Sequence, residues 1–361
     1  MKFRFQYRRY RLPFRNVVRT AHGPWGEREG ILVRLEEVSD GGLGAVGFGE
    51  AAPIPWFGTE TTDAAEQVAR SLGEWIEPEA LHAVPDTLPC LRHAFAAAEE
   101  QIVRALKASE SHPVEVEPVP YLGVAALLPA GKAGLLQIAA KAEAGFRVFK
   151  WKVGVADIAD ELGLLDDMCA SLPEGAKLRL DANGAWDRRR AERWLERCAD
   201  RPIEFVEQPI AADARGSRET LLGLAGDYPT PIALDESLIS ERDVETWIGS
   251  GWPGVFVIKP LLLGHVADVL ARLAHAKADV VFSSALETAV GAKSALELAF
   301  RWAGRETAAA AVTGKRIRRA LGFGVWPLFA DYRFDGPALA PFVRWEDVGR
   351  IDAEAAWNAL S

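Results

Sequence analysis

Carboxylates end several short apolar segments in the second half of the chain, and three of them could bind a metal ion together. Asp181, Glu207 and Asp235 each follow a segment with the composition of a buried strand. Carboxylates brought together from neighbouring strands repel one another, by about 4 kcal/mol per pair at 4 Å and an effective dielectric near 20. All-oxygen ligands without His or Cys favour a hard cation, Mg²⁺ first and Mn²⁺ second. The alternative is a network of salt bridges with Arg179 and the lysines.

Two lysines end further strands and would flank this metal ion. Lys152 ends the second predicted strand and Lys259 the sixth, so they would lie on opposite sides of a barrel mouth. An ammonium near a divalent ion and another lysine has a lowered pKa, which a base at neutral pH requires. Removing the proton next to a carboxylate creates an enediolate, and a metal bound to both carboxylate oxygens stabilises it more than the ground state. The residues therefore indicate metal-assisted proton abstraction.

These side chains need a scaffold in which the strand ends meet. Short apolar segments alternate with amphipathic helical patterns from about residue 116, and an eighth segment, within 318–326, is poorly defined. The pattern predicts a (β/α)8-type barrel, because no Gly-rich dinucleotide fingerprint follows the first strand. A doubly wound α/β sheet is the alternative. The seven strand candidates are residues 119–127, 146–153, 177–183, 203–208, 232–236, 255–259 and 280–284.

The first hundred residues have an α+β pattern. Residues 2–8 alternate apolar and polar side chains, as a strand does, and residues 30–38 and 43–50 read as a hairpin. Residues 62–76 and 88–108 carry helical spacing. Two loops rich in Gly, Pro and Trp, at residues 20–28 and 51–60, are either plain turns or a lid over a pocket.

Composition limits the classes of partner. The 361-residue chain is 49% hydrophobic, and its net charge of -9 with no long basic run argues against nucleic acid and anionic membrane surfaces. Three widely spaced cysteines give neither a disulfide framework nor a thiolate zinc site. The start has no signal-peptide pattern, and no apolar run is long enough for a membrane span. We therefore expect a soluble cytoplasmic protein that acts on a small molecule.

Six motifs in order resemble the enolase superfamily, specifically its muconate lactonizing enzyme subgroup. They are KWK, DANGAW, VEQP, LDES, VIKP and SSALETAVG. The resemblance covers nearly the whole chain and implies an α/β fold, a modified TIM barrel, (β/α)7β, with an α+β capping domain. The capping domain would span residues 1–112, completed by the tail 329–361, and the barrel residues 113–328. A seven-helix barrel explains the weak eighth unit.

The resemblance also implies a role for each polar residue. Asp181, Glu207 and Asp235 would bind Mg²⁺, and Mn²⁺ is the second choice. Lys152 would be the acid/base, and Lys259 would stabilise the enediolate by its charge, as superfamily sites do with Lys and Mg²⁺. Lys150 would tune Lys152, Arg179 and Asn183 would support the ligands, and Ser283, Ser284, His22 and Trp25 would bind the substrate, the two serines at its succinyl end.

The implied reaction is loss of water from a small carboxylate, 2-succinyl-6-hydroxy-2,4-cyclohexadiene-1-carboxylate, in menaquinone and phylloquinone synthesis. Lys152 would remove the proton and return it to the departing hydroxide on the same face. Racemisation of N-succinylamino acids is the main alternative, because Lys152 and Lys259 would supply bases on both faces. Dipeptide epimerisation is disfavoured, because Ser283, Ser284 and Ala285 offer no Asp-x-Asp pair.

Two further alternatives belong to other classes. A Schiff-base aldolase with Lys259 as nucleophile leaves the three carboxylates unexplained. A barrel used only for binding predicts that at least one ligand or base has been lost, and none is missing from the motifs.

Overall fold

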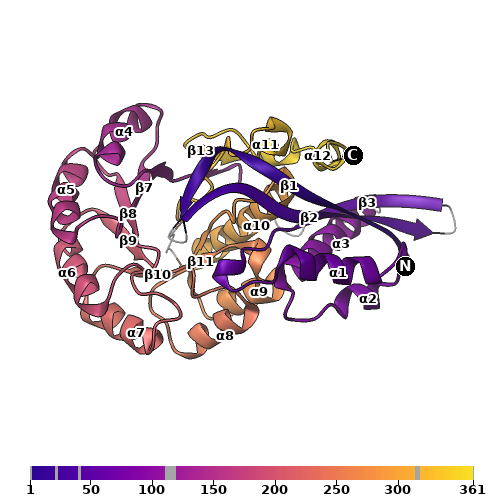
Figure 1. Cartoon of the computed structure of the whole chain (residues 1–361), viewed down its shortest axis with the longest axis horizontal. Coiled ribbons are helices and arrows are strands. Elements are labelled where there is room, and N and C mark those ends of the chain that lie inside the picture. Colours follow the sequence, from indigo (N-terminus) through magenta and orange to yellow (C-terminus); the bar gives the residue numbers. More distant parts are fainter. Residues whose placement is uncertain (1, 21–22, 40–41, 110–118, 314–317, 361) are drawn as a thin grey trace.

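The computed structural model describes residues 2–20, 23–39, 42–109, 119–313 and 318–360. His22 and the predicted domain boundary at 112/113 lie outside these residues. Figure 1 shows long antiparallel strands at one end of the molecule and a curled sheet surrounded by helices at the other.

Seven parallel strands form the curled sheet, in the order β12-β11-β10-β9-β8-β7-β6. The six predicted segments from 146–153 onward each overlap one of these strands, which confirms an α/β fold built on parallel strands. The gap between β12 and β6 is bridged by the isolated parallel pairs Ser283 with Gly322 and Val124 with Leu321, in place of an eighth strand. The bounds are β6 Ala126–Leu128, β7 Val148–Lys152, β8 Lys177–Asp181, β9 Ile203–Glu207, β10 Ile232–Leu234, β11 Val255–Ile258 and β12 Asp279–Phe282.

The prediction of one barrel strand over residues 119–127 is wrong. The structure has two short strands there, β5 (Tyr121–Gly123) and β6. β5 pairs antiparallel with β13 (Phe342–Arg344) from the C-terminal tail, so only β6 joins the barrel sheet. The apolar pattern of both strands is similar, and the partner of each is set by tertiary packing.

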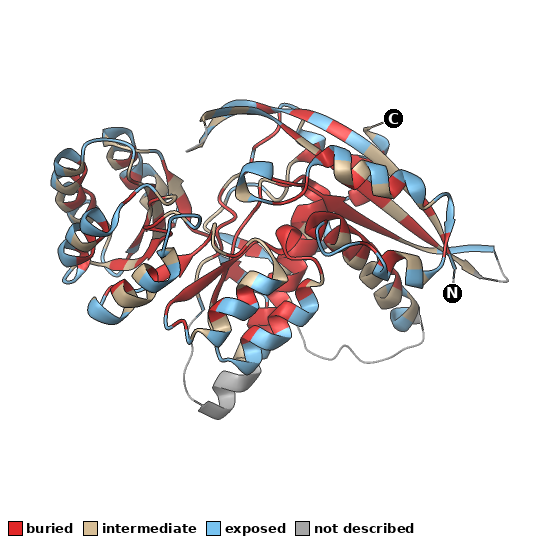
Figure 2. Cartoon of the chain, turned by 60° about the horizontal axis from the view of Figure 1, so that its bottom comes forward, coloured by how far each residue is buried: buried red, intermediate tan, exposed pale blue. Residues whose placement is uncertain are grey.

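Helices cover the outside of the curled sheet, with their apolar sides turned toward it. In α6, Ala191, Trp194, Leu195 and Cys198 recur at helical spacing and are buried. Figure 2 shows the same division along these helices, buried on the side facing the strands and exposed on the other. The bounds are α4 Lys132–Glu143, α5 Ile158–Ala170, α6 Arg188–Cys198, α7 Ser217–Asp227, α8 Glu241–Gly249, η2 Pro260–Leu262, α9 Val266–His275 and α10 Ala289–Thr313.

The N-terminal part is a four-stranded sheet in the order β3-β2-β1-β4, with helices packed against it. Gly47 and Gly49 of β3 lie against α3 so closely that a Cβ on either would come within 1.9 Å of a helix carbonyl oxygen. The predicted hairpin and the helix predicted over residues 88–108 are present. The helix predicted over residues 62–76 ends at Ser71, and Trp75–Ile76 forms strand β4 instead. The bounds are β1 Lys2–Thr20, β2 Gly23–Ser39, β3 Gly42–Ala51, η1 Pro55–Phe57, α1 Thr62–Ser71, β4 Trp75–Ile76, α2 Pro78–His82 and α3 Pro89–Ser109.

The prediction of a loop over residues 20–28 is wrong from Gly23 onward. β2 begins at Gly23 and pairs with the far end of β1, where Val18 lies opposite Trp25. The Gly and Pro residues favour turns, but a long partner strand is present and overrides that local preference.

The C-terminal tail contacts both parts of the molecule. Arg8 of β1 donates a 2.6 Å hydrogen bond to the carbonyl of Trp357, and Lys293 of α10 donates one of 2.9 Å to that of Ile351. The tail elements are η3 Tyr332–Phe334, β13, α11 Trp345–Gly349 and α12 Ala353–Asn358. The division at 112/113, and the assignment of the tail to the first domain, stay predictions.

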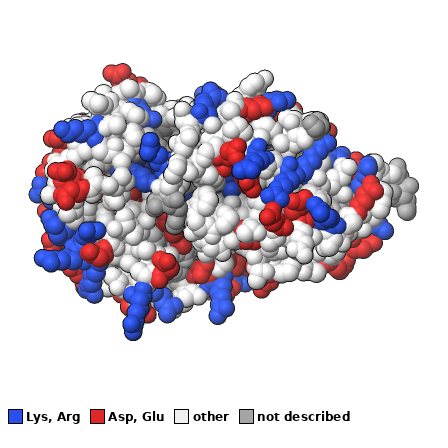
Figure 3. All heavy atoms as spheres, in the orientation of Figure 1, with Lys and Arg blue, Asp and Glu red and all other residues white. Residues whose placement is uncertain are grey.

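Charges of both signs are interspersed over the face shown in Figure 3. None of the described helices combines the length and the apolar character that crossing a membrane requires.

Candidate active site

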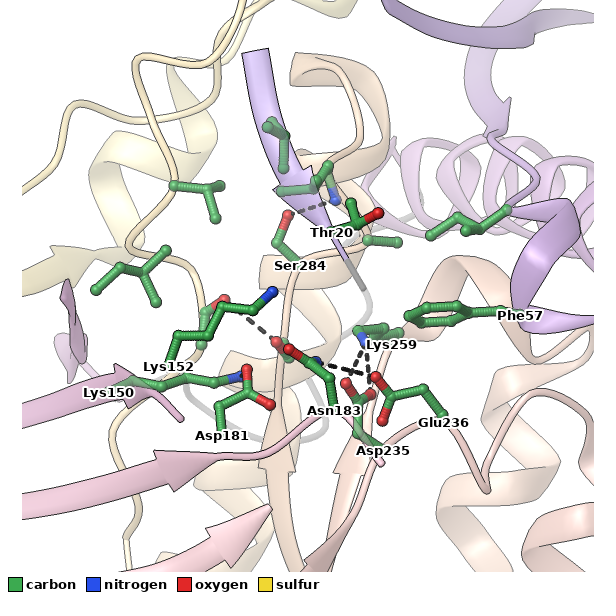
Figure 4. Close-up of a pocket in the computed structure, with 18 of the residues that line it drawn as sticks. Thr20, Phe57, Lys150, Lys152, Asp181, Asn183, Asp235, Glu236, Lys259 and Ser284 are labelled. Carbon is green, nitrogen blue, oxygen red and sulfur yellow. Dashed lines mark hydrogen bonds and ion pairs between the residues drawn. The ribbon is translucent and has the colours of Figure 1, made fainter. Parts of the chain in front are cut away.

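A cavity of about 300 Å³ lies at the carboxyl ends of the barrel strands, beneath β1, β2 and the segment that contains η1. Strand alternation places Lys150 and Lys152 on the same side of β7, and Asp181 ends the neighbouring strand β8. Figure 4 shows the lysines of β7 and Lys259 extending into the pocket from different sides. The predicted residues that line it are Trp25, Lys150, Lys152, Asp181, Asn183, Asp235, Lys259, Ser283 and Ser284.

Lys150 lies between two of the predicted metal ligands. Its Nζ is 2.9 Å from Asp181 Oδ2 and 2.7 Å from Glu207 Oε1. Burial lowers the pKa of Lys150, but attraction to Asp181, Glu207 and Asp235 outweighs it, so the pKa is raised. Burial raises the pKa of Glu207 to about 8, against the opposing effect of Lys150. Glu207 is 2% exposed and lies beneath Lys150, outside the cavity lining.

Lys259 pairs with the third predicted ligand. Its Nζ is 2.5 Å from each carboxylate oxygen of Asp235 and 4.7 Å from the centre of the Phe57 ring. Burial lowers the pKa of Lys259, but attraction to the carboxylates of Asp235 and Glu236 raises it by more, so the pKa is raised overall. The predicted lowering of a lysine pKa concerns a lysine next to a bound divalent ion, and it stays a prediction.

Lys152 sits closer to the mouth than Lys150. Its Nζ donates a 3.2 Å hydrogen bond to the carbonyl oxygen of Arg19, at the end of β1. Among the described residues Lys152 has no ion pair, in contrast to Lys150 and Lys259. Its amine is thus the lysine nitrogen most available to a bound molecule.

The acids are neutralised by lysines in this structure. In the described parts of the chain, no three His, Cys, Asp or Glu side chains are grouped as a metal site. Asp181, Glu207 and Asp235 thus form salt bridges, as the alternative interpretation of the sequence predicted. Their partners are Lys150 and Lys259, and not Arg179.

Oxygen atoms without partners nevertheless surround the cavity floor. Asp181 Oδ1, Asn183 Oδ1 and Glu236 Oε2 are buried and have no hydrogen-bond donor among the described residues. A buried carboxylate or amide oxygen without a donor is costly unless a cation or water satisfies it. An all-oxygen donor set of this kind fits a hard divalent cation such as Mg²⁺.

Two residues that the sequence analysis did not select shape this floor. Glu236 follows Asp235 directly, and burial raises its pKa to about 7. It accepts a 3.1 Å hydrogen bond from Asn183 Nδ2. Gln208, fully buried, accepts hydrogen bonds from the backbone N–H groups of Asp235 and Ser237. Gln208 belongs to the VEQP motif and Glu236 to the LDES motif, so the motifs could have identified both residues.

Arg179 lies below the cavity, one inward-facing position before Asp181 on β8. It donates a 2.7 Å hydrogen bond to Glu204 and one of 2.8 Å to the carbonyl of Ala320, in the segment that takes the eighth strand's place. Its guanidinium lies over the Phe205 ring at 4.8 Å. Arg179 therefore joins barrel strands and contacts none of the three predicted ligands directly.

The two serines have intramolecular hydrogen bonds. Ser284 Oγ donates to Glu287 at 3.0 Å and accepts from the N–H of Leu286 at 2.9 Å. Ser283 Oγ donates to the carbonyl of Gly322 at 3.3 Å. Both hydroxyls stabilise the segment after β12, so any contact they make with substrate adds to, or replaces, these bonds.

Comparison with known proteins gives consistent matches over most of the chain. Residues 135–331 match the family model described as "Enolase C-terminal domain-like", and residues 3–102 match "MenC, N-terminal domain". An o-succinylbenzoate synthase of Thermosynechococcus vestitus is 39% identical over 89% of this chain and 92% of its own length. One of Yersinia enterocolitica is 31% identical over 81% of this chain and 84% of its own.

Solved structures of enolase-superfamily enzymes have the same fold as this chain. The o-succinylbenzoate synthase of Thermosynechococcus elongatus, crystallised with magnesium in its active site, has a TM-score of 0.77 at 36% identity, covering 99% of both chains. The N-succinyl Arg/Lys racemase of Bacillus cereus has the same TM-score at 18% identity, covering 99% of this chain and 98% of its own, which shows a shared fold alone. The modified TIM barrel with a capping domain is thus confirmed. This chain belongs to the o-succinylbenzoate synthase family, in the muconate lactonizing enzyme subgroup of the enolase superfamily.

Proposed function

We propose that this protein is a magnesium-dependent o-succinylbenzoate synthase, a hydro-lyase of menaquinone biosynthesis. Its substrate would be 2-succinyl-6-hydroxy-2,4-cyclohexadiene-1-carboxylate and its product 2-succinylbenzoate. The observation that carries the proposal is one cavity lined by three lysines, Lys150, Lys152 and Lys259, together with carboxylate oxygens that have no donor among the described residues. We infer a cytoplasmic enzyme without a nucleic-acid or membrane partner.

Asp181, Glu207 and Asp235 would hold Mg²⁺, and Mn²⁺ could replace it. The bound ion would supply positive charge next to the substrate carboxylate, which favours the enediolate over the ground state. Lys150 keeps Asp181 and Glu207 neutralised and close together in the absence of other cations.

Lys152 would remove the proton next to the carboxylate. Its amine lines the cavity, and among the described residues it is held by one backbone carbonyl, so it can turn toward a substrate. The resulting ammonium would then return the proton to the departing hydroxide on the same face. One base serves both steps.

Lys259 would stabilise the enediolate by its charge. Its ammonium is paired with both oxygens of Asp235 and lies beside Phe57, in a buried place. In this arrangement Lys259 carries a positive charge next to the floor of the cavity. Racemisation with Lys152 and Lys259 as two bases remains the alternative.

The test is to assay the purified protein with the cyclohexadiene substrate and with an N-succinylamino acid, side by side, with and without Mg²⁺. The proposal predicts magnesium-dependent dehydration at the higher kcat/KM. A protein that racemises the N-succinylamino acid and leaves the cyclohexadiene unchanged is a racemase. Borohydride trapping of a substrate adduct on Lys259 would support the aldolase alternative.

A further inference from the structure

Arg28 of β2 is a fully buried arginine that joins the capping sheet to the barrel. Its side chain is 1% exposed, and a guanidinium has five N–H donors. Each of the five has a backbone carbonyl acceptor. Nε donates to Leu286 at 3.1 Å, Nη1 to Glu29 at 3.1 Å and Pro53 at 2.6 Å, and Nη2 to Ala52 and, at 3.4 Å, Ala285.

These acceptors come from separate parts of the chain, and none is a charged side chain. Within the described residues Arg28 forms no ion pair with a carboxylate. A buried cation without a counter-ion is stable only when dipoles surround it in the right geometry. The position of Arg28 and the positions of the carbonyls of Ala52 and Leu286 therefore depend on one another.

The carbonyls on the barrel side belong to the wall of the active site. Ser283, Ser284, Ala285 and Leu286 all line the cavity. Leu286 has φ = 60°, a left-handed conformation that is unfavourable for a leucine. Two contacts hold it there: its N–H donates to Ser284 Oγ, and its carbonyl accepts from Arg28.

The capping side of the same guanidinium supports a second part of the wall. The Cζ of Arg28 lies 5.1 Å from the centre of the Trp25 ring, and Trp25 also lines the cavity. Trp25 packs edge-on against Trp56, with ring centres 4.7 Å apart. One buried cation thus contacts aromatic and main-chain groups that line the cavity from two structural units.

Resting on the proposed function, we infer that Arg28 is a positioning residue for substrate binding. It holds the turn 284–286 and Trp25 in the shape that receives the part of the substrate away from the reacting carbon. Figure 4 shows Ser284 apart from Asp181 and Asp235, on another side of the pocket. Changes at Arg28 should therefore affect KM more than kcat.

The main variant is Arg28→Lys, which keeps the charge but has three donors on one nitrogen and cannot reach five separated carbonyls. The matched control is Arg34→Lys on the same strand, since Arg34 is partly buried and bonded to Gln6 and Glu36. We expect R28K to raise KM for the cyclohexadiene about tenfold or more and to change kcat by less than about threefold. R34K should leave both constants within about twofold.

Two further readouts separate positioning from general damage. The Kd of 2-succinylbenzoate, followed by tryptophan fluorescence without turnover, should rise in R28K by about the same factor as KM. In Arg28→Ala, added guanidinium ions should lower KM by about threefold or more, whereas the wild type should not respond. All variants are measured at least about 10 °C below their own Tm, so that unfolded protein does not contribute.

An active wild type with KM and product affinity unchanged in R28K would overturn the positioning role and leave the proposed function intact. A fall in kcat at constant KM would overturn it as well. A folded wild type that does not dehydrate the cyclohexadiene would instead overturn the proposed function. Should R28A fail to fold, R28K decides alone.

Discussion

The ammonium of Lys259 lies 2.5 Å from both carboxylate oxygens of Asp235, in the buried floor of the barrel mouth. The pair neutralises Asp235 without any other cation. A divalent ion that binds Asp235 must therefore compete with Lys259 or share the carboxylate with it.

Replacing Lys259 by Met should separate metal binding from catalysis. The change removes a competing and repelling cation, so we expect Mg²⁺ affinity, measured by calorimetry, to stay the same or to increase. The dehydration rate should fall by about 10²-fold or more, because the enediolate loses a charge that stabilises it. Lys177→Met, at the exposed far end of β8, is the control. Weaker Mg²⁺ binding with an unchanged rate would contradict the assigned role.

Lys152→Ala should abolish nearly all dehydration and leave the fold intact. Loss of a general acid/base costs about 10²–10⁴ in rate, and Lys152 serves both proton transfers. The side chain donates only one described hydrogen bond, to Arg19, so Tm should change little. Circular dichroism and thermal unfolding check the fold, again beside a substitution at Lys177. More than a few per cent of residual rate would remove Lys152 from its role.

Asp235→Asn should weaken Mg²⁺ binding, because a carboxylate ligand becomes a neutral amide. We expect at least about a tenfold increase in Kd by calorimetry, equivalent to about 1.4 kcal/mol. Asp160→Asn, on the exposed first turn of α5, is a control of equal charge change. Unchanged affinity in Asp235→Asn would show that Asp235 is not a ligand.

Glu287 should make stability fall as pH rises through neutrality. Burial raises the pKa of Glu287 to about 7, from an ordinary value of 4.5. The folded protein therefore holds this proton more tightly than the unfolded chain does. The resulting stability is fully present below about pH 4.5 and is lost by about pH 7, with an upper limit of about 3 kcal/mol.

Glu287→Gln should remove this pH dependence and stabilise the protein at pH 8 relative to wild type. The amide oxygen can still accept from Ser284 and the N–H of Ala285, as the carboxylate does now. Urea unfolding at pH 5 and pH 8 measures the difference, with Glu174→Gln at an exposed position as the control. Parallel pH profiles in wild type and Glu287→Gln would contradict the prediction.

The arrangement of the barrel could be predicted because its strands are short, apolar and end in polar residues. Alternation on β7 placed Lys150 and Lys152 on one side, and the end of β8 placed Asp181 beside them. The cavity does contain these residues with Asp235 and Lys259. The carboxyl ends of parallel strands meet at one face of a barrel, whatever helices connect the strands. The order of the strand-ending residues along the chain was therefore sufficient to predict that they lie together.

Other features depend on contacts that the sequence does not encode locally. That Lys150 sits between Asp181 and Glu207 is a matter of side-chain reach across three strands. The 20–28 segment has turn composition, yet β1 supplies it with a partner strand. Arg28 looks like an ordinary surface arginine in a charged stretch, and only the packing of the capping sheet against the turn at Leu286 buries it.

A crystal structure of the protein grown with Mn²⁺ in place of Mg²⁺, with the ion located by its anomalous signal, tests the metal site most directly. We predict one ion bound by Asp181, Glu207 and Asp235, with Lys150 and Lys259 moved off direct contact with the ligand oxygens and Lys152 still free to face the substrate. A structure with no ion at these carboxylates in excess metal, and with both lysine pairs still in place, would contradict the proposed site and the chemistry built on it.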